Sequence, residues 1–234
     1  MILLALKEAV VQSKLLLVAC VAAAAGCGRS YAELSPAVGA TPASGPGEGA
    51  VATAAGVRVS AHAQAWHFDP PDLESKVTPV LIELANNGDR NIVVRYKDIA
   101  LTDAGGTRYE AIPPYNISGT LSVPVTVQDP YFYNGYAYAY RYAPMYVRYA
   151  GGFVYDPQYY QPYLTVYTDV ALPTPEMVQR SLPEGAIAPG GTAGGFVYFK
   201  AFRRGERLLT LHVDMIDQTS GEILGTAKIP FIAN

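Results

Sequence analysis

Histidine is the side chain best suited to acid–base chemistry or metal binding near neutral pH. This chain of 234 residues has three of them, His62, His67 and His212. His62 and His67 are five residues apart, and an odd separation places two side chains on opposite faces of a regular strand. The tripeptide HFD at 67–69 offers two metal ligands at a strand end, although solvated side chains are the simpler interpretation. His212 lies between two apolar residues, which predicts the outer face of a strand. The histidines therefore predict no shared metal site.

Carboxylates are the second group that could carry chemistry. Asp98, Asp103 and Glu110 fall near one predicted hairpin, but a glycosidase would need two of them across a cleft. Neither G-x-S-x-G nor H-E-x-x-H nor a phosphate loop occurs. The run GGTAGG at 190–195 leads into a predicted strand and lacks the helix N-terminus of a phosphate site. We expect a protein that is not an enzyme and holds no cofactor or metal. The alternative is a hydrolase whose site combines scattered acids and histidines.

Tyrosine is the residue type with the most unusual distribution, because 13 of the 18 tyrosines lie between Tyr131 and Tyr167. Within this stretch, Asn134-Gly135 is flanked by alternating residues, a pattern typical of a two-residue hairpin turn. Facing residues of such a hairpin share one side of the sheet, so one face would carry Tyr131, Tyr133, Tyr136, Tyr138 and Tyr140. Cross-strand aromatic pairs of this kind stabilise a hairpin by about 0.2–1 kcal/mol each.

Three interpretations of the tyrosine-rich stretch stay open. The rings could clamp the hairpin onto the domain with their hydroxyls in water, or the segment could be a mobile loop. They could also form a platform that stacks sugar rings or grips a partner protein, because tyrosine buries a large area at small entropic cost. Residues 131–167 contain no lysine and only three charges. This composition, with a net charge of −3, is unlike a nucleic-acid platform.

The N-terminal segment indicates the cellular compartment to which the protein is exported. Lys14 precedes a run of apolar and small residues from Leu15 to Ala25, which is about half the length that spans a bilayer. A basic residue, a short apolar region and small residues at its end are typical of a signal peptide. We therefore expect residues 1–26 to be a signal peptide.

The end of this segment, AAGC at Ala24–Cys27, resembles the lipobox of bacterial lipoproteins. The resemblance implies that Cys27 is acylated, becomes the first mature residue and anchors the chain in a membrane. LVAC at Leu17–Cys20 fits the pattern letter by letter but leaves too short an apolar region, so Cys27 is preferred. Cleavage there would leave one cysteine and no possible disulfide. Gly28 in place of the family's retention aspartate favours the outer membrane over the inner one.

The next segment predicts a tether. Residues 36–56 consist almost entirely of Gly, Ala, Pro, Ser, Thr and Val, with Glu48 as the only charge. Such a composition is typical of a flexible linker. We therefore predict that residues 27–56 comprise the lipidated cysteine and a flexible tether, and that the folded domain spans 57–234.

From Val57 onward the pattern has period two and indicates strands. Val80, Ile82 and Leu84 share one face, and the C-terminal third contains three further strands, the last two separated by a turn at 218–221. Thr174 followed by a proline and a glutamate predicts the start of one short helix. At least seven short strands indicate a β-sandwich.

Three stretches of this pattern resemble immunoglobulin-like domains of bacterial envelope lipoproteins: VTPVLIELANNGD, DIALTDAGGTRYEAIPP and IAPGGTAGGFVYF. The resemblance implies a mainly β, immunoglobulin-like sandwich, to which the residues themselves add one short helix and the tyrosine-rich hairpin or loop insertion at about 129–168. The resemblance covers about two thirds of residues 57–234 and leaves the tyrosine-rich stretch outside it. From the tyrosine pattern we expect a cell-envelope lipoprotein that binds or scaffolds through this insertion. Its partners would be the membrane, through the lipid anchor, and an envelope protein or polysaccharide, but no nucleic acid. An envelope hydrolase is the alternative.

Overall fold

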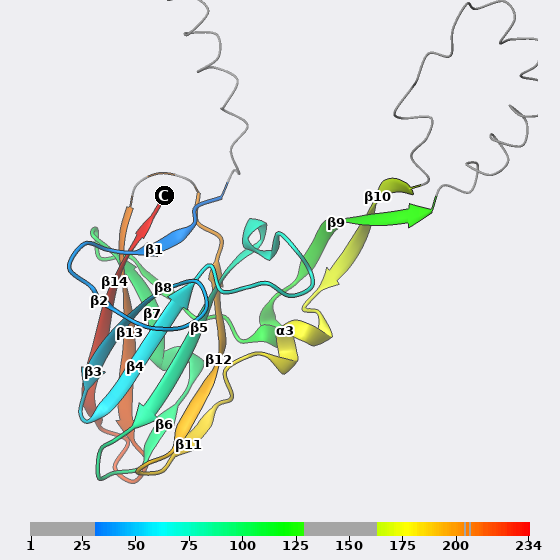
Figure 1. Ribbon diagram of the computed structural model, residues 1–234. Helices are drawn as coiled ribbons and strands as arrows, with labels where there is room; N and C mark the ends of the chain where they lie inside the picture. The colour runs from blue at the N-terminus through cyan, green and yellow to red at the C-terminus, as the bar shows by residue number, and fades with distance from the viewer. Residues whose placement is uncertain (1–30, 129–162, 204, 206) are drawn as a thin grey trace, which may run out of the picture.

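The structure is a computed structural model that describes residues 31–128, 163–203, 205 and 207–234. Two antiparallel sheets lie face to face as two layers, and buried side chains from both form one core between them (Figure 1). A separate two-stranded ribbon joins the domain at one side. Within the described residues, no helix combines the length and the apolar content that crossing a bilayer requires.

One layer is a five-stranded sheet with the order β12-β5-β4-β3-β2. Its strands are β2 (Thr41–Pro42), β3 (Glu48–Ala54), β4 (Val57–Ala63), β5 (Val77–Asn86) and β12 (Thr192–Lys200). Pro79 pairs with Tyr198 of β12, whereas the β4 pairing reaches only as far as Leu81. The proline therefore lies where β5 has one neighbour, as its missing N–H requires.

The other layer is a seven-stranded sheet with the order β1-β14-β13-β6-β11, in which β7 also pairs with β13 and with β8. Its strands are β1 (Leu34–Pro36), β6 (Ile92–Val94), β7 (Ile99–Asp103), β8 (Arg108–Glu110), β11 (Gly185–Ile187), β13 (Arg207–Asp217) and β14 (Ile223–Ala233). The hairpin of β13 and β14 is the one that the turn at 218–221 predicts.

The core follows from alternation along the strands. Val80, Ile82 and Leu84 of β5 are at most 1% exposed, which confirms the face predicted for them. Leu211 of β13 and Phe231 of β14 are fully buried from the opposite sheet. Each such side chain contributes about 1.5–3 kcal/mol through its removal from water, so the two sheets stabilise each other.

A second, smaller core lies outside the pair of layers. It contains Trp66, Met177, Phe196 and Tyr198, together with the 3₁₀ turns Leu73–Ser75 (η1) and Pro114–Asn116 (η3) at its margin and the helix α3 (Pro175–Gln179). A further 3₁₀ turn, η2, spans Tyr96–Asp98. The α3 start is confirmed, because the Thr174 hydroxyl accepts a hydrogen bond of 3.2 Å from the Met177 amide.

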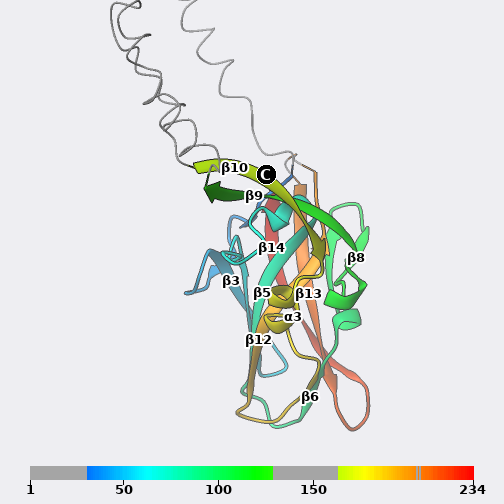
Figure 2. The same ribbon diagram turned by 90° about the vertical axis from the view of Figure 1, so that its right-hand side faces the viewer.

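The ribbon consists of β9 (Gly119–Gln128) and β10 (Tyr163–Leu172), paired antiparallel over their full length. Figures 1 and 2 show it extending from the two layers at the end of the molecule where β1 lies. Leu121 and Val123 are buried, but Val125 and its partner Val166 are more than a third exposed. The ribbon therefore packs by its inner half and carries residues 129–162 from its outer end.

The tether prediction is wrong for residues 31–56. β1 pairs with β14, and β3 pairs with β4 over seven residues, so this segment belongs to both sheets. Leu34 and Ala50 are almost fully buried in the core. The small side chains that suggested a linker fit a strand that packs closely against its neighbours. The folded domain consequently begins at about residue 31 and not at Val57.

The mainly β fold with one short helix in the described part is confirmed. The immunoglobulin-like strand arrangement stays a prediction.

Candidate functional site

The residues predicted to carry function fall largely outside the described residues. Cys27 lies before them, and the five tyrosines lie within 129–162: Tyr131, Tyr133, Tyr136, Tyr138 and Tyr140. Lipidation and the tyrosine platform therefore stay predictions. The structure describes the two strands on either side of the tyrosine-rich segment, β9 and β10, but not the segment itself.

His62 is the one histidine among the described residues that is fully buried. It lies on the outer face of β4, yet its side chain is fully buried because residues 43–49 pass over it. A Cβ added at Gly45 or Gly49 would overlap its imidazole ring. Neither ring nitrogen has a hydrogen-bond partner among the described residues. Within the same residues, no three His, Cys, Asp or Glu side chains gather to hold a metal ion.

The acids singled out in the sequence each serve a local turn. Asp98 pairs with Arg95, and Glu110 lies 4.0 Å from Arg108. Asp103 accepts hydrogen bonds from the Thr107 amide (2.9 Å) and the Tyr109 hydroxyl (3.0 Å), and the amide above all lowers the pKa of its carboxyl. These contacts explain the acids as parts of the β7–β8 hairpin and the turn before it. They do not form a catalytic pair.

The half-buried His212 faces outward from β13, as predicted. Burial lowers the pKa of its imidazole, and the neighbouring charges of Lys228 and Arg108 lower it further. The strand pairing of His212 with Lys228 and Ala100 accounts for its position.

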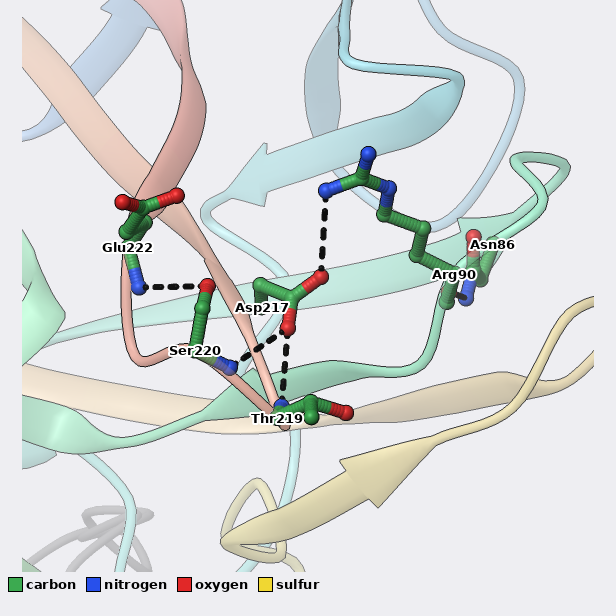
Figure 3. Close-up of polar contacts among 6 residues, drawn as sticks. All are labelled: Asn86, Arg90, Asp217, Thr219, Ser220 and Glu222. Carbon is green, nitrogen blue, oxygen red and sulfur yellow. Dashed lines mark hydrogen bonds and ion pairs between the residues drawn. The ribbon is translucent and has the colours of Figure 1, made fainter.

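Asp217 is the buried carboxylate that sequence reasoning missed. One of its oxygens accepts the amides of Thr219 and Ser220, each at 2.8 Å, and the other lies 3.4 Å from the Arg90 guanidinium (Figure 3). The two amides are the main cause of the lowered pKa of this carboxyl. Its role is to close the β13–β14 turn and to join it to the loop before β6. The sequence signal is an aspartate two residues before a turn threonine.

A half-open cavity of about 730 Å³ lies where the N-terminal segment, the loop 64–76 and α3 meet. His67 belongs to its lining together with Asp69 of the same HFD tripeptide, and both side chains are exposed. The HFD tripeptide, which the sequence singled out as two possible ligands, thus contributes two residues to the lining of this cavity, although the sequence predicted no cleft there.

Hydrogen bonds within the chain fix the shape of the loop 64–76. The Trp66 indole donates to the Pro70 carbonyl at 3.0 Å, and the Gln64 amide donates to the Leu34 carbonyl at 3.0 Å. Gln64 and Asp72 both have left-handed backbone conformations, with φ of 54° and 57°. The Tyr31 hydroxyl, on the N-terminal segment, donates to Asp72 at 3.4 Å.

Aromatic rings support one wall of the cavity. Trp66 packs edge-to-face against Phe68 and Phe196, with centroid separations of 5.4 and 5.1 Å. The guanidinium of Arg180 lies 3.5 Å from the centroid of the Phe68 ring and also pairs with Glu176 of α3. Phe68 and Glu176, which both line the cavity, therefore already share a cation supplied by the chain itself.

Carboxylates dominate the charge of the lining. Five acids contribute to it, and no lysine or arginine does: Glu33, Asp69, Asp72, Glu74 and Glu176. All five are exposed or half-exposed. A general acid active near neutral pH needs a carboxyl whose charged form burial disfavours, and this lining has no buried carboxyl. One of the five, Glu176, is already paired with Arg180, so the arrangement is not that of a proton-transfer site.

Neither the protein-family models nor the curated proteins contain a match to this chain. Among solved structures, a similar chain is a provisionally described lipoprotein (ycdA) of Bacillus subtilis, which is 12% identical. The likeness covers 86% of this chain and 36% of the other, with a TM-score of 0.32. This chain thus spans about a third of the length of that protein, and a likeness of this degree assigns neither family nor function.

Proposed function

We propose that the protein is a lipid-anchored, non-enzymatic binding module of the cell envelope. The observation that carries the proposal is the cavity of about 730 Å³ at the end of the domain where the chain enters. Its volume falls in the range of small-molecule sites, about 300–1,000 Å³. The signal-peptide pattern and the lipobox-like AAGC support the envelope location, with the outer membrane favoured by Gly28.

Anchoring at Cys27 would hold this cavity close to a bilayer. Four residue steps separate Cys27 from Tyr31, and even a fully extended chain covers only about 14 Å over that number. Tyr31 lines the cavity. The domain would therefore stand directly on the membrane surface, in contrast to the long tether that composition suggested.

The ribbon of β9 and β10 supports a second binding surface. Because its outer half exposes Val166 and Tyr167, it is suited to presenting the tyrosine-rich segment 129–162 to an envelope protein or a polysaccharide. This role rests on the sequence pattern of the segment together with the pairing of its two flanks.

An envelope hydrolase is the second candidate, favoured by one observation: His67 and five carboxylates line the same cavity. Against it stands the exposure of these carboxylates, since none is buried enough to resemble a general acid.

Capture from a detergent extract of the envelope tests the proposal. Wild-type chain, a chain with 129–162 replaced by a short Gly-Ser linker, and Asp69→Asn/Asp72→Asn serve as baits. Loss of a specific partner or glycan with either variant supports a binding module and identifies the surface. Turnover of envelope glycan or peptide substrates by the wild type, abolished in Asp69→Asn/Asp72→Asn, would establish the hydrolase instead.

A further inference from the structure

The ribbon of β9 and β10 carries an apolar face outward from the domain. Side chains alternate between the two faces of a strand, so Leu121 and Val123 lie on the same face as Val125 and its partner Val166. The first two side chains are buried, whereas Val125 is 39% and Val166 is 38% exposed. On the opposite face, Tyr167 is 73% exposed. The outer half of the ribbon therefore presents apolar or aromatic side chains on both faces.

The outer half of the ribbon also has few of the features that keep an edge strand soluble. Among the described residues neither strand has a second neighbour, so each has one unpaired edge of backbone N–H and C=O groups. Charged side chains and prolines usually protect such edges. Pro124 is the one such residue in 120–128, and residues 163–168 contain none. The first charge, Asp169, pairs with Ser122 in the inner half. This surface is suited to an apolar neighbour that also offers hydrogen-bond partners.

The position of the ribbon identifies that neighbour. Figures 1 and 2 show the ribbon at the end of the domain where β1 and the C-terminus lie. Tyr31, which precedes β1, is four residue steps from Cys27, at most about 14 Å along an extended chain. An acyl group on Cys27 would hold this end of the domain against the lipid headgroups. The interface of a bilayer accepts valine and tyrosine, and its water and headgroups can satisfy free backbone groups, as the hydrocarbon core cannot.

We propose that the outer half of the ribbon is a membrane contact, which enters the headgroup layer of a lipid bilayer beside the anchor. The inference rests on the lipid-anchored function proposed above, and it adds a second attachment that fixes how the domain stands on the membrane. Such a surface binds lipid in proportion to the apolar area that it buries. Because this part of the ribbon has no charge, the contact needs no anionic lipid and should not weaken with salt.

Fluorescence quenching by brominated lipid tests the contact independently of acylation. The mature chain, residues 27–234 with Cys27→Ser, is held on phosphatidylcholine vesicles by an N-terminal hexahistidine and a nickel-chelating lipid. This tether reproduces the position of the predicted anchor. Tyr167→Trp adds an indole to the ribbon, and the emission of the buried Trp66 is subtracted with the chain that lacks this substitution. Brominated acyl chains should quench most of the added emission, to the same extent at low and at high salt.

The matched control is Ile223→Trp. Ile223 is 63% exposed and begins β14, whose opposite end pairs with β1, so the indole added there should escape quenching. Val125→Thr/Val166→Thr, introduced into Tyr167→Trp, should lower the quenching several-fold, because the buried apolar area falls. Threonine retains a preference for strands, and both positions are more than a third exposed. The melting temperature of this variant should therefore stay at the value for Tyr167→Trp alone.

Absence of quenching in Tyr167→Trp, equal quenching in Ile223→Trp, or no effect of Val125→Thr/Val166→Thr would overturn the proposal. Loss of quenching at high salt would also overturn it and assign the contact to charged residues such as Arg203, which pairs with Tyr31 at the same end.

Two further outcomes would replace the bilayer contact of the ribbon by another one. Loss of quenching in a chain with 129–162 replaced by a Gly-Ser linker would move the contact to that segment. A dimer in sedimentation that Val125→Thr/Val166→Thr dissociates would assign the surface to a second copy of the chain. Because the tether does not use acylation, absence of quenching refutes the ribbon contact alone, and absence of acyl label on Cys27 refutes the anchor alone.

Discussion

The backbone amide of Ala32 donates a hydrogen bond of 2.9 Å to the carbonyl oxygen of Phe202. This contact joins the first described residues to the loop between β12 and β13, and Leu34 follows at once with a buried side chain. A segment whose composition suggests a linker is thus bonded into the domain from its start. The lipid anchor predicted at Cys27 and the cavity at Tyr31 consequently become neighbours.

A truncated chain that begins at Val57 should fail to fold. It lacks β1, β2 and β3, and the loss of Leu34 alone corresponds to about 2–5 kcal/mol, a large share of the 5–15 kcal/mol typical of a domain. Thermal melting followed by circular dichroism checks this. A chain from Tyr31 should melt cooperatively. A cooperative transition of the Val57 chain at the same temperature would restore the tether hypothesis.

Gly49 and His62 should be energetically coupled. An added Cβ at Gly49 overlaps the His62 ring, so Gly49→Ala should lower the free energy of unfolding by about 1–3 kcal/mol. In the background of His62→Ala, where the ring is absent, the same change should have little effect. Urea unfolding of the four chains gives the coupling energy. Equal effects of Gly49→Ala in both backgrounds would show that residues 43–49 do not cover His62.

Asp217 should make stability depend on pH in the acid range. Its carboxyl has a lowered pKa in the folded protein, mainly through the amides of Ser220 and Thr219. A lowered folded-state pKa contributes stability that is present above the unfolded pKa, about 3.9, and is lost as the pH falls through the folded value. Between pH 7 and pH 2, Asp217→Asn should therefore lose less stability than the wild type.

The exposed neighbour Asp89 provides the control for this measurement. Asp89→Asn should follow the wild-type pH profile of the free energy of unfolding. Parallel profiles for the wild type and Asp217→Asn would contradict the structural role of the Asp217 carboxylate.

Regular alternation made much of the fold predictable. Val80, Ile82 and Leu84 define a buried face by period alone, and the cap at Thr174 depends on contacts within four residues. Residues 31–56 were not predictable in this way. A segment of small residues is typical of a linker when nothing packs against it. Here β4 and the His62 ring, which come later in the chain, pack closely against it.

The site was harder to predict because its residues come from distant segments. Tyr31, His67 and Glu176 line one cavity, yet no spacing in the sequence relates them. The burial of His62 could not be predicted for the same reason, because the segment that covers it precedes it by more than a dozen residues and shows no motif. The HFD tripeptide was the one local signal of the cavity.

Metabolic labelling with an alkyne-bearing palmitate analogue tests the lipid anchor, on which the envelope function depends most directly. The full chain, Cys27→Ser and Cys20→Ser are expressed in a bacterium, and the label on each purified protein is measured. We expect label on the full chain and on Cys20→Ser, and none on Cys27→Ser. Label lost only from Cys20→Ser, or absent from all three chains, would contradict a domain held at the membrane by Cys27.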